Sequence, residues 1–183
     1  MNVNTMRDNR MKFVKSENGL DYYIFTPTLF RQYFNKSEEW TPHRKSIAHK
    51  IHMFLYYMRG GYKILYMLDG DNIVAYLVYA RCGKTVVENT TREDIFTVFV
   101  TTHPNYRHNG YATKIVYELL HGINLKYSKS FKTISDSNIG SLKSALKNGY
   151  QVIFPIKKSK TFKTIIRTDY SKTKLYVVEN NMN

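Results

Sequence analysis

The chain has 183 residues, enough for one domain with a substantial hydrophobic core and too few for two comfortable ones. Hydrophobic residues make up 43% and aromatic residues 15%, which excludes a disordered or fibrous protein. The net charge is +14; residues 101–183 hold 14 Lys and Arg against 4 Asp and Glu, whereas residues 1–100 hold 14 against 10. This asymmetry favours an anionic partner such as nucleic acid, an acidic membrane, a phosphorylated cofactor or a nucleotide-linked substrate, with simple solubility as the alternative.

The single cysteine, Cys82, excludes a disulfide framework, a cysteine-based zinc site and a redox pair, and it indicates a reducing cytoplasm. The N-terminal stretch lacks the apolar run of a signal peptide. The most apolar helical segment, residues 47–58, is interrupted by His49, Lys50 and His52. Because a bilayer span needs about 20 apolar residues, we expect a cytoplasmic protein with no membrane span.

In chain order, the first half predicts a strand, two helices and three strands. The strand is at 22–26, and the helices are at 26–35, with Pro27 in the first turn, and at 43–61, ended by two glycines. Two strands, 62–68 and 72–81, flank the hairpin signature DGDN, and the apolar run 94–102 predicts a central strand.

The second half alternates helices and strands. The helix at 138–149 has Ile139, Leu142 and Leu146 on one face. The other predicted elements are a helix at 109–121 and strands at 130–135, 150–154, 161–168 and 173–179. Antiparallel hairpins around a central strand–helix–strand crossover predict an α/β fold with a mixed, mostly antiparallel twisted sheet and helices on both faces. We expect one domain over residues 1–183, with residues 1–20 as a partly ordered N-terminal extension.

The start of the 109–121 helix lacks the acidic residue that usually stands there. A helix start carries partial positive charge, yet the approach holds Arg107 and His108, and no acid occurs before Glu118. A bound phosphate would supply the missing charge, because free N–H groups and the helix dipole form an anion site that Gly110 leaves open to close approach. The alternative is an ordinary helix capped by Asn109, with Arg107 in solvent.

Two motifs then resemble a known family. The two phosphate loops G-x-x-x-x-G-K-[ST] and G-x-G-x-x-G are absent. However, PNYRHNGYA (104–112) resembles P-x-x-[RQ]-x-x-G-x-[GA], the pyrophosphate-loop motif of the GNAT superfamily of acetyl-CoA-dependent N-acetyltransferases. NIGSLKSALKNGY (138–150) is similar to the family's second motif, N-x-x-[AS] followed by a helix and G-[FY], and the element order agrees from about residue 22 onward.

The resemblance implies a division of roles at an acetyl-CoA site that contains no metal. The backbone of Val100, Thr101 and Thr102 would bond the pantetheine arm at a strand bulge. Asn138 and Ser141 would contact the pantetheine side of the cofactor. The pyrophosphate would be held by the N–H groups of a continuous run, namely Arg107, His108, Asn109, Gly110, Tyr111, Ala112 and Thr113.

The catalytic positions depart from the family pattern. A glutamate base is common eleven residues before the motif's Arg, where this chain has Phe96. Asp94 lies two residues earlier and is our candidate base, with an exposed hairpin carboxylate as the alternative. A tyrosine acid is common seven residues after the motif's Asn, where this chain has Ala145. Tyr150 is our candidate acid, with packing as the alternative.

These observations predict an enzyme that acetylates a primary amine of a small-molecule or peptide acceptor by direct attack on acetyl-CoA in a ternary complex. The acceptor would be held by the two N-terminal helices, the hairpin 84–94 and the final strands. A basic series at 157–174 favours an acidic acceptor, such as a nucleotide-linked amino sugar, an aminoacyl-tRNA or an acidic peptide; a solvated basic face is the alternative. The rival function is a non-catalytic CoA-binding or nucleic-acid-binding module on the same fold. A monomer and a homodimer are both open.

Overall fold

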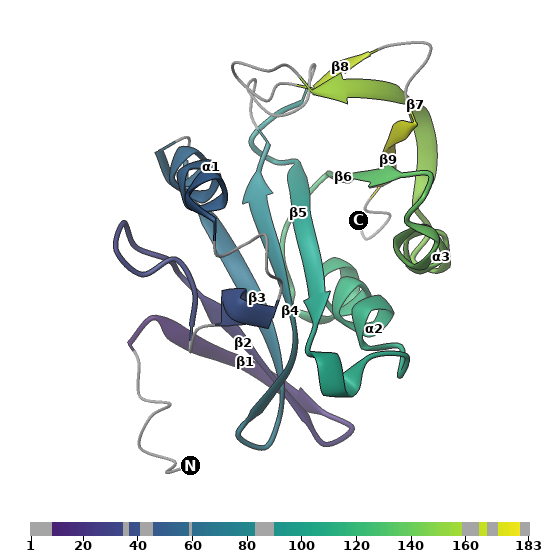
Figure 1. Ribbon diagram of the computed structural model, residues 1–183. Helices are drawn as coiled ribbons and strands as arrows, with labels where there is room; N and C mark the ends of the chain where they lie inside the picture. The colour runs from purple at the N-terminus through teal and green to yellow at the C-terminus, as the bar shows by residue number, and fades with distance from the viewer. Residues whose placement is uncertain are drawn as a thin grey trace. The chain divides into compact units, whose positions relative to one another are not determined.

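A computed structural model describes residues 9–34, 37–40, 46–58, 60–82, 90–158, 165–167 and 172–179 (Figure 1). The chain forms two compact units, which are described separately. The first unit comprises Met1–Ala80 and Phe99–Ile115, and the second comprises Arg81–Val98 and Val116–Asn183. Two strands and one helix continue from one unit into the other.

The strands form a mixed sheet in the order β1-β2-β3-β4-β5-β6-β9-β7-β8. Of the registers that the structure describes, β5–β6 is parallel and the others are antiparallel. This confirms the predicted α/β fold with a mixed, mostly antiparallel sheet. The strands are β1 (Met11–Glu17), β2 (Leu20–Phe25), β3 (Tyr62–Asp69), β4 (Asn72–Arg81), β5 (Ile95–Thr102), β6 (Lys129–Ser135), β7 (Gln151–Lys158), β8 (Ile165–Arg167) and β9 (Thr173–Glu179).

Helical segments follow the predicted order with one exception. The predicted helices at 43–61, 109–121 and 138–149 correspond to α1 (Ile47–Met58), α2 (Tyr111–Tyr117) and α3 (Ile139–Lys147). α2 continues as the π-helical turn η5 (Glu118–Gly122), and two 3-10 turns, η2 (Ser37–Trp40) and η4 (Pro104–Tyr106), lie in the connections. None of the helices in the described part of the chain has the length and apolar character needed to cross a membrane.

The core of the first unit centres on the β3–β4 hairpin. Residues 64–68 of β3 and 73–80 of β4 are buried without a break, so side chains on both faces of these two strands are covered. Tyr66 and Tyr76 stand opposite each other in the register, with ring centroids 5.5 Å apart. Met53 is the one fully buried residue of α1. The loop after β5 is attached to this hairpin, since His103 N donates to Val74 O at 2.9 Å.

The predicted helix at 26–35 is wrong over its described residues, 26–34. Thr28 and Arg31 instead close a turn, in which each backbone N–H bonds to the other residue. Phe34 N donates to the Tyr66 hydroxyl at 3.0 Å, and the Tyr62 hydroxyl donates to Gln32 O at 3.2 Å. Tertiary hydrogen bonds thus take backbone groups that a helix would have used internally, so tertiary context overrides the local pattern.

Two further differences concern β1 and α3. β1 pairs with β2 and lies within the segment 1–20, where the sequence predicted only a partly ordered extension. On α3, Ile139 and Leu146 are 54% and 56% exposed, whereas Ser144 and Ala145 are buried. The predicted apolar face is therefore not the packed one, because α3 packs through its small side chains.

Candidate active site

The loop between β5 and α2 presents a row of backbone N–H groups without acceptors. α2 begins at Tyr111, and its first turn holds no acidic residue. The first helical bond runs from Thr113 N to Gly110 O, at 3.0 Å. Across the described residues, no protein acceptor receives the N–H groups from His108 to Ala112. Unpaired N–H groups and the helix dipole both favour negative charge, so this arrangement suits an anion.

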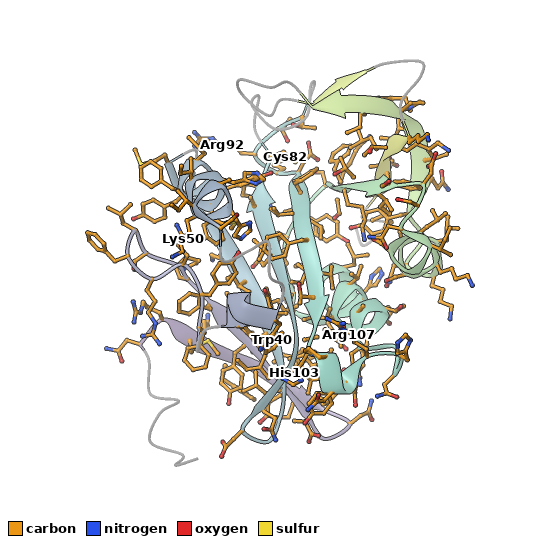
Figure 2. The ribbon with its side chains drawn as sticks, in the orientation of Figure 1. Trp40, Lys50, Cys82, Arg92, His103 and Arg107 are labelled. Carbon is orange, nitrogen blue, oxygen red and sulfur yellow. The ribbon has the colours of Figure 1, made fainter. Side chains whose placement is uncertain are left out.

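The predicted alternative, in which Asn109 caps the helix, is not what the structure shows. The Asn109 side chain donates from Nδ2 to Tyr106 O at 3.5 Å and accepts no helix N–H. The side chains of Arg107, His108 and Asn109 are exposed, and Arg107 is labelled on this loop in Figure 2. The loop therefore adds solvent-accessible positive charge beside the unpaired N–H groups.

Gly110 has a backbone conformation that favours glycine. Its φ is +78°, and His108 two residues earlier has φ +68°. A Cβ built on Gly110 would meet no protein atom within 4 Å. The glycine is thus required for the course of the chain, not for contact with another protein group, and the space above it is open to a ligand.

β5 and β6 pair over only part of their length. The parallel register covers three residue pairs, the last of which joins Thr97 to Lys132. β5 continues to Thr102 and β6 to Ser135 with no further pair in this register. The predicted pantetheine-binding segment, residues 100–102, lies beyond the last pair, with Thr101 buried and its two neighbours half-buried. Extended backbone at such a position can pair with an amide-rich ligand as with an added strand.

Asn138 and Ser141, predicted to contact the pantetheine side, are joined at the start of α3. Asn138 is the N-cap, and its Oδ1 accepts from Ser141 N at 3.1 Å. Both belong to the second unit, and Asn138 is exposed. This capping bond alone explains why an asparagine stands here. Contact of Asn138 and Ser141 with a cofactor stays a prediction.

Asp94 is buried and fully engaged, not the exposed carboxylate of the alternative interpretation. It is 5% exposed. Oδ2 accepts from Thr91 N at 2.8 Å, and Oδ1 accepts from Lys129 N at 3.0 Å. The carboxylate therefore ties the segment before β5 to the first residue of β6. This geometry supports a bracing role better than a role as base, which stays a prediction.

Tyr150 is 1% exposed, and its hydroxyl lies 2.6 Å from Ser130 Oγ. Burial raises the pKa of Tyr150 to about 12, although hydrogen bonding to Ser130 acts in the opposite direction. Phe96 and Ala145, at the positions where the resemblance places a base and an acid, are both buried. A buried phenol with so high a pKa is a poor proton donor near neutral pH, so its role as acid also stays a prediction.

An aromatic cluster that the sequence did not reveal surrounds Phe99 of β5 in the first unit. The Tyr33 hydroxyl lies 2.7 Å from His49 Nε2, and both rings contact Phe99, with centroids 6.5 and 5.7 Å away. Trp40 stands edge-on to His103, with ring centroids 4.8 Å apart, and both residues are labelled in Figure 2. We define the aromatic cluster as Tyr33, Trp40, His49, Tyr76, Phe99 and His103. In the sequence, the histidines of residues 47–58 were noted only because they interrupt an apolar segment, and they were not predicted to belong to a site.

A basic pocket of about 440 Å³ lies in the second unit, where β4 ends and β5 and β6 begin. Arg81 Nη1 donates to Glu93 O at 3.1 Å, and Glu93 Oε2 accepts from Ser128 Oγ at 3.2 Å. In the described part of the chain neither Arg92 nor Lys126 forms an ion pair. The lining residues are Arg81, Arg92, Glu93, Lys126, Tyr127 and Ser128. Three cations against one carboxylate make this pocket suited to an anionic group.

Parts of the predicted acceptor region lie outside the described residues. These parts are residues 83–89 of the hairpin 84–94 and most side chains of the basic series 157–174. Tyr33 and His49 of the aromatic cluster nevertheless come from the two segments that were predicted as N-terminal helices, and both lie in the first unit.

Comparison with known proteins identifies the family. A model of the acetyltransferase (GNAT) family matches residues 26–150. No curated protein sequence matches the chain. Diaminobutyrate acetyltransferase from Paenibacillus lautus, solved with L-2,4-diaminobutyric acid and coenzyme A, is 17% identical with TM-score 0.55, and the match covers 90% of this chain and 98% of that one.

Two further structures are similar to this chain, with lower sequence identity and lower TM-scores. The ribosomal-protein-S18-alanine N-acetyltransferase from Escherichia coli is 8% identical with TM-score 0.54, over 88% of this chain and 96% of that one. An acetyltransferase from Thermus thermophilus is 10% identical with TM-score 0.45, and the match covers 64% of each chain. Because the identities are this low, the similarities to the P. lautus and E. coli structures establish the fold alone.

Proposed function

Because this chain belongs to the GNAT acetyltransferase family, we propose that it transfers an acetyl group from acetyl-CoA to a primary amine of a small-molecule or peptide acceptor. The observation that carries the proposal is the run of N–H groups from His108 to Ala112 that no described protein group accepts. A diphosphate fits this run chemically, since it offers several anionic oxygens to adjacent donors. Arg107 and His108 add exposed charge on the same loop.

The direction of the chain would orient acetyl-CoA bound at this loop. β5 leads directly into the loop of residues 103–110. A diphosphate on this loop would therefore let the pantetheine arm run back along Thr102, Thr101 and Val100, pairing with backbone groups as an added strand does. Asn138 and Ser141 are proposed as further contacts to the arm.

The chemistry needs a neutral amine, a polarised carbonyl and a protonated leaving sulfur. Backbone N–H groups of β5 can polarise the carbonyl without any particular side chain. Holding amine and thioester together in a ternary complex supplies much of the acceleration. We keep Asp94 as the proposed base and Tyr150 as the proposed acid, although the hydrogen bonds of both residues are those expected of structural roles.

The aromatic cluster supports an amine acceptor. Phe99, on the strand that would carry the acyl arm, is in contact with Tyr33 and His49. Rings of this kind provide apolar walls and favour a cationic or aromatic group on their faces. The P. lautus structure holds a small diamino acid, and the E. coli enzyme is named for a protein alanine. Both small and peptide amines are therefore within the proposed class.

The basic pocket favours an acceptor with an anionic group. Its cations belong to the second unit, at the start of β5 and β6. A carboxylate or phosphate on the acceptor would meet Arg92 and Lys126, which have no described ion-pair partner. We propose that this pocket selects acidic acceptors, and nucleic acid stays a broader alternative for the basic surface.

The second candidate function is a CoA-binding module without catalysis. It is favoured by the burial of Phe96 and Ala145 and by the engaged oxygens of Asp94 and Tyr150. Calorimetric titration with acetyl-CoA and a thiol-release assay over a panel of amines separate the two. Binding with turnover of at least one amine supports the enzyme; binding with no turnover on any amine favours the module. Absence of acetyl-CoA binding contradicts both.

A further inference from the structure

One side of α1, in the first unit, is apolar and exposed. At about 100° per residue, four large apolar residues of this helix fall within about 60° of one another on its circumference. Their side chains are 37–77% exposed, and together they span about 16 Å along the helix axis. We call these four residues the α1 apolar stripe: Ile47, Ile51, Phe54 and Met58.

The opposite side of α1 carries polar residues and faces the protein. Met53 is fully buried on this side, and His49, His52 and Tyr56 are half-buried beside it. His49 Nε2 lies 2.7 Å from the Tyr33 hydroxyl, and the ring centroids of His52 and Tyr56 are 5.1 Å apart. A surface helix of a globular protein normally has the reverse arrangement, with its apolar side inward. Packing within the first unit therefore does not explain the α1 apolar stripe.

The segment that follows β2 adds exposed apolar side chains next to α1. Gln32 Nε2 donates to Lys50 O at 3.2 Å, so this segment is attached to the helix. Phe30, two residues before Gln32, is 95% exposed, and Leu29 is also exposed. Single exposed apolar residues are ordinary, whereas several gathered in one region mark an interaction site.

The sequence around these side chains is basic. Residues 22–37 and 41–68 together hold seven Lys and Arg and no Asp or Glu, and Glu38 and Glu39 lie between the two stretches. Lys50 is exposed, and on the helix circumference it flanks the α1 apolar stripe. Electrostatics therefore favours a negatively charged partner for this surface.

The carboxylates that the structure describes in the first unit lie at the other end of its sheet. Glu17 and Asp21 flank the β1–β2 turn, and Asp69 and Asp71 flank the β3–β4 turn. Both turns lie at the same end, since Asp21 stands opposite Leu68 in the register. α1 leads into the opposite end of β3 (Figure 1). The first unit is therefore acidic at these turns, and apolar and basic at α1.

We propose that α1 docks the protein on the surface of anionic lipid membranes. The α1 apolar stripe lies where the headgroups meet the acyl chains, and Lys50 keeps its charge among the headgroups, as in helices that lie in the plane of the membrane interface. Binding then combines the burial of apolar area with attraction to acidic lipids. A second copy of the chain fits this surface less well, because two stripes in contact bring two basic surfaces together. A helix face of about 16 Å also falls short of a standard protein–protein interface.

Flotation of the full chain with lipid vesicles tests the proposal. The assay contains no acetyl-CoA, so its outcome does not depend on the proposed acetyl transfer. Vesicles of phosphatidylcholine mixed with phosphatidylserine are compared with vesicles of phosphatidylcholine alone. We expect about tenfold or more tighter binding to the mixed vesicles. Binding should weaken in 1 M salt, where the Debye length falls to about 3 Å.

The variant Ile47→Gln, Met58→Gln removes the two most exposed side chains of the stripe and leaves the charge unchanged. We expect its affinity for the mixed vesicles to fall about tenfold or more, because less apolar area is buried. The melting temperature should stay unchanged, since both side chains are exposed. The matched control is Ile139→Gln, Leu146→Gln on α3, which also removes two exposed apolar side chains from a helix with exposed lysines. This control should bind vesicles as wild type does.

A charge variant tests the second contribution. Lys50→Gln leaves the stripe intact and should weaken binding to the mixed vesicles about fivefold. Equal binding of wild type to both kinds of vesicle, or no binding to either, overturns the proposal, as does an equal loss in the α3 control. Light scattering without lipid measures self-association. A wild-type dimer that the α1 variant abolishes, with no vesicle binding, would assign the stripe to a second copy of the chain and overturn membrane docking.

Discussion

Replacement of Gly110 by valine should separate the ligand role of the loop from the strain in its backbone. Gly110 has φ +78°, and a side chain there meets no protein atom within 4 Å. A residue with a Cβ in this conformation costs about 1–2 kcal/mol. The Cβ would also project into the space that a diphosphate would occupy. We therefore expect two separate effects, one on stability and one on acetyl-CoA affinity.

Gly19, in the β1–β2 turn, provides a matched control. Its φ is +75°, and it too has no atom within 4 Å of a built Cβ. Gly110→Val and Gly19→Val should therefore lose similar stability, a few degrees in melting temperature for a chain of this size. They should differ in ligand binding, because only one of them lies among the unpaired N–H groups.

The expected loss of affinity follows from the hydrogen bonds. If the valine displaces the diphosphate from two N–H donors, and each charge-assisted bond contributes about 1.5 kcal/mol, the loss is about 3 kcal/mol. This corresponds to roughly 100-fold in Kd. Isothermal titration calorimetry with acetyl-CoA measures it directly. A Gly110→Val protein that is folded and binds acetyl-CoA within threefold of wild type would refute the assignment of the loop, as would an equal loss in Gly19→Val.

Two other predictions address the remaining site residues. Asp94→Asn should destabilise the protein by about 1–3 kcal/mol, because the amide nitrogen that replaces one carboxylate oxygen cannot accept, so Thr91 N and Lys129 N cannot both keep their partners. Thermal melting measures this loss. A 100-fold loss of kcat at unchanged stability would instead establish Asp94 as the base. The double variant Arg92→Glu, Lys126→Glu should raise KM about tenfold or more for acceptors that carry a carboxylate or phosphate and leave KM for neutral amines unchanged; an equal effect on both classes would refute selection by the basic pocket.

Much of the fold was predictable because it depends on local patterns. The DGDN turn between two apolar runs predicted the β3–β4 hairpin, and the helix predicted at 109–121 starts within two residues of the observed start of α2. The helix expected at 26–35 failed since Phe34 and Gln32 bond to tyrosines of β3. Such long-range hydrogen bonds leave no periodic trace in the sequence.

The site was less predictable than the fold. The N–H groups of the loop could be predicted because backbone donors depend on the course of the chain and not on side-chain identity. The hydrogen bonds of Asp94 were not predicted, because the contact with Lys129 N becomes visible only when β6 is placed beside β5. The contact of His49 with Tyr33 and Phe99 likewise joins three segments far apart in sequence.

The proposed function depends on the binding of the acetyl-CoA diphosphate by the backbone N–H groups from His108 to Ala112. The most direct measurement follows the amide resonances of these five residues in ¹⁵N-labelled protein during titration with coenzyme A and, separately, with pantetheine, which has no diphosphate. We expect large shifts at all five residues with coenzyme A and small ones with pantetheine. Equal shifts with both compounds, or none at these residues with coenzyme A, would contradict it.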